Sequence, residues 1–406
     1  MKNTRNAIWL GLLFLLSLRG VAQYEPPDAS SEPLAHLTSH PRVERRAPKA
    51  QVSVKVGMEK QLFASYILAT AALNEPNDAY TLGDGDGLVA VFVQNPTPDT
   101  HVRVEIGATP FSDAAVYEGT MQEAGRQYQV TPRLAWNYQK LRALQQPTPI
   151  NLTITTYIDE IKAGHRTVVA TLRSVNDCPY FWEEKGNPTG GMDLNYMYTA
   201  YINEDDPVVD QILAEALKTG IVTGFDGYQS GNPKTVDEQV FSIWYALQKR
   251  GVRYSSISTN SSTGSSARLY SQRIRLIDQT WNVRQANCAD AMVLFASVLR
   301  SIHIEPVLVL FPDHCFLGYY RDDDRRDFVC LETSMVGELN LAKIPVTKRV
   351  KTSRQMFATA RARAQRQYNE LKEIFASRKE PHYRFITVAD ERKAGIRPIG
   401  RASDSF

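Results

Sequence analysis

The chain has 406 residues, of which 43% are hydrophobic and 22% are charged, and its formal net charge is +3. This length is enough for two or three domains with ordinary hydrophobic cores. The small net charge argues against a protein that depends on a strongly basic surface to bind nucleic acid or a membrane.

The N-terminus has the pattern of an export signal. Two basic residues precede the apolar run Ala7–Leu18, which is shorter than the roughly 20 residues that a membrane-spanning helix needs. Small residues follow at Gly20 and Ala22. We therefore expect residues 1–22 to be a signal peptide cleaved near Ala22, and the mature protein to be periplasmic or secreted with no stable membrane span. An uncleaved anchor helix is the alternative, although Arg19 interrupts it.

Residues 23–50 are rich in proline, serine and charge and predict a disordered linker. Residues 51–176 then show short alternating apolar segments separated by turn-forming residues, which predict an all-β sandwich of immunoglobulin-like size. The candidate strands are Val52–Val56, Leu88–Gln94, Val102–Ile106, Gln127–Val130, Ile150–Ile158 and Thr167–Leu172. Helical propensity appears at Trp136–Leu144. The glycine and aspartate run Gly83–Gly87 lacks the remaining ligands of a calcium loop and favours a tight turn.

Residues 177–200 are expected to be a joint, and residues 201–345 to be a second domain that begins with helices. The first helix has Asp206 as its N-cap and a proline at its first position, a combination typical of helix starts. The second is predicted to start with a capping box at Thr235 and to stop at Gly251.

A polar stretch, Ser255–Ser266, precedes the most informative part of the chain. It predicts a surface loop, or a flap over a cleft. Gln272 and Gln285 lie between this stretch and Cys288, and either could donate a hydrogen bond to an oxyanion beside a thiol nucleophile, with the backbone amide of Cys288 as the first donor. The spacing does not choose between them.

Cys288 is placed where a strongly apolar helix should begin. Asn287 is a suitable N-cap and Asp290 puts a carboxylate in the first turn. The following run Ala291–Leu299 is almost entirely apolar, which predicts a buried helix. A thiol at such a helix start meets the positive end of the helix dipole and unpaired backbone amides, and both favour the thiolate.

The next segments predict three strands, over 306–311, 314–320 and 328–333. If His314 pairs opposite Glu332, the alternation of side chains puts these two residues on one face and Cys315 on the other, away from the site. A carboxylate beside the histidine would orient the imidazole and stabilise its charged form. A nearby Cys288 would then complete a nucleophile, a base and an orienting acid.

These motifs resemble the transglutaminase-like superfamily. The resemblance covers roughly residues 236–337 and rests on Ala-Asn-Cys-Ala-Asp at 286–290, Pro-Asp-His-Cys-Phe at 312–316 and Leu-Glu-Thr at 331–333. It implies a domain with the papain-like, cysteine-proteinase type of α+β fold and a catalytic triad of Cys288, His314 and Glu332. The acid is glutamate where many relatives have aspartate. The superfamily includes hydrolases, acyltransferases and inactive members, so the fold does not select the reaction.

The remaining cysteines, Cys178, Cys315 and Cys330, do not have the spacing of a disulfide framework. We expect no structural disulfide. Residues 346–406 predict a C-terminal helix and tail: a long helix over 353–377 docked on its own domain, then one strand over 383–388, and then a frayed end.

The sequence therefore predicts a multidomain, exported protein that acts as a thiol-dependent amide or ester hydrolase or an acyltransferase. The expected substrate is a peptide or protein, no nucleic acid is expected to bind, and no metal or organic cofactor is required. The alternative is a non-catalytic binding or scaffold protein of the cell envelope with the same fold. A solvent-accessible Cys288 that is hydrogen-bonded to His314 would favour the enzyme, whereas a Cys288 buried among core residues would favour the scaffold.

Overall fold

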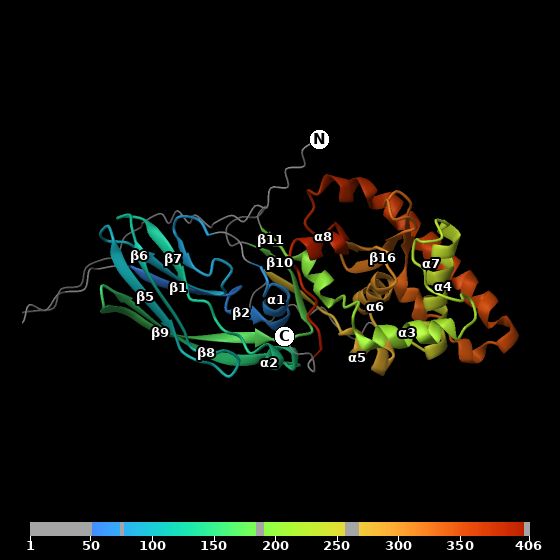
Figure 1. Ribbon diagram of the computed structural model, residues 1–406, viewed down its shortest axis with the longest axis horizontal. Helices are drawn as coiled ribbons and strands as arrows, with labels where there is room; N and C mark the ends of the chain where they lie inside the picture. Colours follow the sequence, from blue (N-terminus) through green and yellow to red (C-terminus); the bar gives the residue numbers. More distant parts are fainter. Residues whose placement is uncertain (1–50, 74–76, 184–190, 256–267, 402–406) are drawn as a thin grey trace, which may run out of the picture. The chain divides into compact units, whose positions relative to one another are not determined.

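The computed structural model describes residues 51–73, 77–183, 191–255 and 268–401. The predicted signal peptide, the linker over 23–50 and nearly all of the polar stretch at 255–266 lie outside these residues. Among the helices of the described residues, none combines the length and the apolarity that crossing a bilayer requires. The described chain mixes helices with several separate sheets (Figure 1).

The N-terminal region contains two sheets. The first has four strands in the order β1-β4-β7-β3, and the second has five in the order β2-β9-β8-β5-β6. Their bounds are β1 (Val52–Val56), β2 (Gln61–Phe63), β3 (Thr81–Gly83), β4 (Val89–Gln94), β5 (Thr100–Ile106), β6 (Ala115–Met121), β7 (Gln127–Thr131), β8 (Thr148–Ile158) and β9 (Ile161–Arg173). Alternate residues of both sheets, such as Val91, Val104 and Leu152, are buried in the same core, as the period of two predicts.

Two short helices complete this region. Helix α1 (Ala64–Ala69) is buried along its whole length. Helix α2 (Tyr138–Arg142) lies inside the segment with predicted helical propensity and is capped by the Asn137 side chain. The glycine and aspartate run closes a turn, in which the Gly87 amide donates to the Asp84 carbonyl over 2.9 Å.

The stretch expected to be a joint forms part of a third sheet. Strand β10 (Asp177–Glu183) pairs with β11 (Gly191–Asp193) on one side and with β13 (Leu269–Arg273) on the other. The 3-10 helix η1 (Asn195–Tyr201) follows. The Ser65 hydroxyl of α1 donates to the Asp177 carbonyl over 2.6 Å. Strand β10 therefore ties the N-terminal region to a segment that lies close to Cys288 in the sequence.

The helices that follow mostly match the prediction. Helix α3 (Pro207–Leu217) is capped by Asp206, whose carboxylate accepts from the Val208 amide at 2.9 Å. Helix α4 (Pro233–Arg250) ends at a left-handed Gly251, as expected. Its predicted start was wrong, because the N-cap is Asn232 rather than Thr235. Pro233 fixes the backbone angle of the first helical residue, so the helix begins there.

The C-terminal region is built on a sheet with the order β17-β16-β15-β18. Its strands are β15 (Pro306–Phe311), β16 (His314–Tyr320), β17 (Phe328–Leu331) and β18 (Arg384–Thr387). Leu317 on one face joins the core around helix α6 (Cys288–Ser301), and Phe316 on the other packs with Ala364 of helix α7 (Val346–Ser377). The helices α6 and α7 thus cover opposite faces of this sheet (Figure 1).

The smaller elements connect these layers. They are β12 (Arg253–Tyr254), α5 (Ile277–Val283), β14 (Gln285–Ala286), the 3-10 helices η2 (Thr333–Gly337) and η3 (Leu341–Lys343), and α8 (Val388–Lys393). Helix α7 starts earlier than predicted but buries the predicted apolar stripe, including Phe357, Ala360 and Phe375.

The prediction that the chain frays after residue 388 was wrong. Residues 388–393 form α8, and the Arg397 amide then donates to the Ala69 carbonyl of α1 over 2.9 Å. The Ile399 amide donates to the Ala200 carbonyl, and the Ile399 carbonyl accepts from the Arg142 guanidinium, each over 2.9 Å. The segment 397–399 therefore fastens the N-terminal region to η1 through backbone groups that local sequence patterns do not reveal.

Candidate active site

The start of helix α6 fixes the position of Cys288. The Asn287 side chain accepts from the Asp290 amide at 2.7 Å, and the Asp290 carboxylate accepts from the Asn287 amide at 3.0 Å, so both halves of a capping box are present. The Arg275 guanidinium also holds the Asp290 carboxylate, at 2.6 Å. Cys288 is thus the first residue of a well-anchored helix, where its own amide has no acceptor within the helix.

His314 and Glu332 meet beside this helix start. The His314 Nε2 atom lies 2.7 Å from the Glu332 Oε2 atom. The other carboxylate oxygen accepts from the Ser334 hydroxyl at 2.6 Å and from the Ser334 amide at 3.3 Å. Glu332 is buried, so these contacts fix it as the hydrogen-bonded partner that orients the imidazole.

The predicted pairing of these two residues was two positions out of register. Leu317 pairs with Leu331, and β17 ends there, so Glu332 lies beyond the ladder and its side chain reaches back to His314. A shift of two residues leaves every side chain on its original face. The predicted contact between His314 and Glu332 is therefore present despite the wrong register.

Cys288 lies close enough to His314 for each side chain to shift the pKa of the other, through hydrogen bonding and through charge. Because Nε2 faces Glu332, Nδ1 is the nitrogen left for the sulfur. Burial by itself lowers the pKa of His314, but the hydrogen bonds and negative charges of Cys288 and Glu332 outweigh it and raise that pKa to about 9. Burial likewise raises the pKa of Glu332, but the bond to His314 and its charge bring that pKa below the usual value. The histidine is therefore held as an imidazolium.

Cys315 contacts the nucleophile, and the prediction that it faces away from the site was wrong. Both residues line the same cavity, and hydrogen bonding from the Cys315 side chain is the largest cause that lowers the pKa of Cys288, with a smaller contribution from the Cys315 backbone. Burial opposes this effect, and His314 adds to it, so the pKa of Cys288 falls to about 5. The Cys315 thiol is buried and its pKa is raised well above the usual value by the neighbouring thiolate and by burial. Cys315 therefore remains protonated and donates to the thiolate.

All four cysteines are free thiols. Cys315 belongs to the core on the α6 side of the sheet, whereas Cys330 belongs to the core on the α7 side. The alternation of side chains along a strand thus correctly predicted that Cys315 and Cys330 lie on opposite faces of the sheet. It did not reveal that α6, which begins with Cys288, covers the face that carries Cys315.

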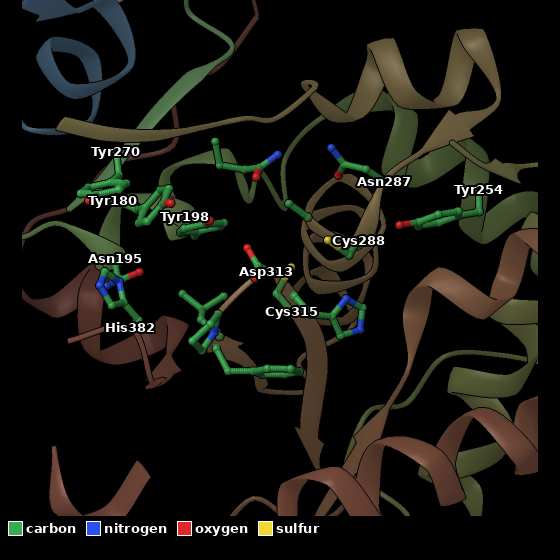
Figure 2. Close-up of a pocket in the computed structure, with 16 residues that line it drawn as sticks. Tyr180, Asn195, Tyr198, Tyr254, Tyr270, Asn287, Cys288, Asp313, Cys315 and His382 are labelled. Carbon is green, nitrogen blue, oxygen red and sulfur yellow. The ribbon is translucent and has the colours of Figure 1, made fainter. Parts of the chain in front are cut away.

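A cavity of about 470 Å³ opens at Cys288. Figure 2 shows Cys288 and Asn287 on one side of it and Tyr180, Tyr198, Tyr270, Asn195 and His382 on the other. The Tyr254 hydroxyl points toward Cys288 in the same view. The nucleophile is therefore open to a ligand, and the wall that faces it is largely aromatic.

The two glutamines that were candidates for oxyanion stabilisation lie in different places. Gln272, on β13, lines the cavity. Its side-chain amide donates to the Arg273 carbonyl over 2.9 Å, which engages one of its two N–H groups. Gln285 is exposed on β14 and is not among the residues that line the cavity. The Cys288 amide and the second N–H of Gln272 therefore remain as candidate donors.

The aromatic wall was not predicted from the sequence. Its residues come from β10, η1, β13 and the segment before β18, which are far apart in the chain. Tyrosines are common in cores and strands, so no local signal marked these ones.

Within the described residues, no group of three or more histidine, cysteine or acidic side chains is arranged to hold a metal ion.

Comparisons with known proteins do not identify the chain. No protein-family model matches it, and no curated protein sequence matches it significantly.

Proposed function

We propose that this protein is a thiol enzyme that cleaves or transfers an acyl group from an amide or ester, with Cys288 as nucleophile, His314 as acid and base, and Glu332 as the residue that orients His314. One observation carries the proposal: a half-buried Cys288 lines an open cavity beside His314, which lowers the pKa of Cys288 and is in turn bonded to Glu332 at 2.7 Å. These are the contacts that thiol catalysis requires.

The proposed reaction begins with attack of the Cys288 thiolate on the carbonyl carbon. A carbon–sulfur bond forms, the carbonyl electron pair moves onto oxygen, and the amide of Cys288 donates to that oxyanion. The tetrahedral intermediate collapses as His314 gives its proton to the leaving amine or alcohol. The neutral His314, oriented by Glu332, then takes a proton from water or an amine, which attacks the thioester carbon and releases the thiolate.

The types of the two domains, the export of the protein and its class of substrate are also part of the proposal. The sheet β17-β16-β15-β18, covered by α6 and α7 on opposite faces, supports a transglutaminase-like domain of the cysteine-proteinase type. The two sheets of the N-terminal region, which share a core, support an immunoglobulin-like sandwich before it. The basic and apolar N-terminal residues support export, and the open cavity supports a peptide or protein substrate.

A non-catalytic scaffold is the second candidate. Its support is the Met292 and Phe295 packing that buries the body of α6. Cys288 itself is not buried among these residues, since it lines the cavity and contacts His314. The position of Cys288 in the cavity lining favours the enzyme over the scaffold.

The test is the pH dependence of Cys288 alkylation by iodoacetamide in the full chain, with the labelled cysteine identified by mass spectrometry. We expect labelling to titrate with a midpoint of about 5, because the thiolate reacts and the thiol does not. In His314→Ala the midpoint should rise, because a hydrogen bond and a positive charge that stabilise the thiolate are lost.

Hydrolysis of a chromogenic ester should be highest between pH values of about 5 and 9, since acid protonates the thiolate and alkali deprotonates the imidazolium.

His165→Ala is the matched control, because His165 is exposed on β9, and it should leave the midpoint unchanged. A Cys288 that resists alkylation in the native protein, or that titrates near 8.5 as an ordinary thiol whatever occupies position 314, would overturn the enzyme proposal and leave the scaffold.

A further inference from the structure

The wall of the cavity opposite Cys288 is formed by aromatic rings in tilted and edge-on contact. The ring centroids of Tyr180 and Tyr270 are 6.1 Å apart, and those of Tyr180 and Tyr198 are 6.3 Å apart. The His382 ring packs edge-on against Phe181 at 4.9 Å. Figure 2 shows the tyrosines grouped on the side away from Cys288. Because the faces of such rings carry partial negative charge, they attract cations within about 6 Å.

A carboxylate lies between this wall and the nucleophile. Asp313 occupies the turn that joins β15 to β16, directly before His314. Its φ of 63° follows Pro312, and proline followed by a positive φ is typical of a tight type II turn. Figure 2 shows the carboxylate directed into the cavity, and Asp313 interacts electrostatically with Tyr180. No ion pair between Asp313 and another described residue is present.

The charges around the cavity are unbalanced. Its lining contains the Asp313 carboxylate and neither lysine nor arginine. The thiolate of Cys288 and the imidazolium of His314 cancel each other, and the buried Glu332 carboxylate lies behind His314. The local field is therefore negative and favours a cation over an anion.

We propose that Asp313, together with the rings of Tyr180, Tyr198 and Tyr270, forms a subsite for a positively charged group, an ammonium or guanidinium, of the molecule that reacts at Cys288. The inference rests on the proposed function. The cation has two possible sources: a basic side chain on the acyl substrate, or an amine that accepts the acyl group. In the second case the ammonium held by Asp313 first loses one proton to solvent. The resulting neutral amine bonds through its nitrogen to the thioester carbon as His314 takes a second proton from that nitrogen, and the carbon–sulfur bond breaks to release the Cys288 thiolate.

The subsite can be tested without knowing the substrate. Small methanethiosulfonates exist with a trimethylammonium, a sulfonate or an uncharged methyl group. With each of them, the thiolate attacks the sulfenyl sulfur, a mixed disulfide forms and methanesulfinate leaves with the electron pair. We would measure the rate of each reagent at Cys288 at pH 7 in the full chain. The rate with the trimethylammonium reagent is divided by the rate with the sulfonate reagent, and this ratio is compared with the same ratio for a small free thiol.

We expect the wild-type ratio to exceed that of the free thiol. Asp313→Asn should lower it by on the order of tenfold, as loss of one charge about 4 Å from the reagent's charge in a solvated site predicts. Asparagine tolerates the positive φ, so the turn is kept. Tyr180→Leu should slow the cationic reagent about two- to fivefold relative to the uncharged one. Asp324→Asn is the control, because it removes an exposed carboxylate from the loop that follows the other end of β16 and should leave the ratio unchanged.

The outcomes separate the two proposals. A Cys288 that reacts rapidly with all three reagents, but with the free-thiol ratio in both wild type and Asp313→Asn, overturns the subsite and leaves the enzyme proposal intact. A Cys288 that reacts with all three as slowly as an ordinary thiol overturns the enzyme proposal and the subsite with it.

A second measurement distinguishes the two sources of the cation. If it belongs to the acyl substrate, wild-type kcat/KM should favour a lysyl ester over a norleucyl ester, and Asp313→Asn should abolish the preference. If it belongs to the acceptor, an acyl-enzyme made from an uncharged ester should partition to added butylamine over water, and Asp313→Asn should reduce that partition. A variant that changes neither quantity overturns the subsite.

Discussion

At the scale of single residues, the contact between two thiols is the least expected feature of the site. Cys315 donates to the Cys288 thiolate from a buried position on β16, whereas His314, one residue earlier, reaches the sulfur from the end of the strand. Neighbouring strand residues normally face opposite ways. Both act on Cys288 at the end of β16, where His314, paired with Phe311, is the last residue of the ladder before the turn at Asp313.

Replacement of Cys315 should therefore change the acidity of Cys288. In Cys315→Ala the side-chain donor is lost, and we expect the midpoint of alkylation to rise by about one to two pH units, since a hydrogen bond to a charged group contributes about 1.5–3 kcal/mol and one pKa unit is 1.36 kcal/mol. Cys315→Ser keeps a hydroxyl donor and should hold the midpoint near the wild-type value. Equal midpoints in the alanine and serine variants would show that the thiol contributes nothing to the thiolate.

At the scale of elements, the sequence predicted more of the site than of its surroundings. The cap at Asn287, the helix start at Cys288 and the strands at β15 and β16 were confirmed, because each depends on residues close together in the chain. The short strands β2 and β3 and the strand β6 were not predicted. The three-residue strands owe their place to partners far away, β9 and β7. Local propensity does not contain that information.

The cap of α6 is predicted to serve both stability and reactivity. Asn287→Ala removes the acceptor for the Asp290 amide and should lower the free energy of unfolding by about 1 kcal/mol, as loss of an N-cap usually does. Because Cys288 is the first helical residue, fraying of this turn should also raise the midpoint of alkylation. Urea unfolding and the pH titration of labelling measure the two effects.

Asn232→Ala is the matched control for this prediction, since Asn232 caps α4 in the same way and is not among the residues that line the cavity. Asn232→Ala should lower the free energy of unfolding by a similar amount and leave the midpoint of Cys288 alkylation unchanged. If both variants leave that midpoint at the wild-type value, the cap does not position the thiol.

At the scale of the whole molecule, the site depends on residues that only the complete fold brings together. The cavity joins β10, η1, β13, the turn before β16 and His382. The contact between His314 and Glu332 beside Cys288 was predicted from one stretch of the chain. The residues that face it were not, because their proximity follows from the pairing of β10 with β13 and from the course of the chain after α7. The described residues belong to one compact unit, so we expect them to unfold together.

Arg142 offers a test of this cooperativity. Its guanidinium is buried and donates to the Ile399 carbonyl at 2.9 Å, so Arg142→Met should lower the free energy of unfolding by about 1–3 kcal/mol. Arg166→Met, at an exposed position on β9, should change it little. In urea, tryptophan fluorescence and the rapid alkylation of Cys288 should be lost in one transition, and the midpoint should fall in Arg142→Met. Two separated transitions would show that the regions are independent.

The hydrogen bonds made by residues 397–399 can form only at the end of synthesis of the described chain. A ribosome makes roughly 5–20 residues per second, so on the order of ten seconds separate the synthesis of Glu332 from that of Ile399. During that interval Cys288, His314 and Glu332 all exist in the nascent chain, but β18 has not yet paired with β15 and the contacts to Ala69 and Ala200 are absent. Because β15 pairs with β16, which begins at His314, and also with β18, we expect this sheet to be complete only after residue 387 has been made, and the contacts to Ala69 and Ala200 to form only after residue 399.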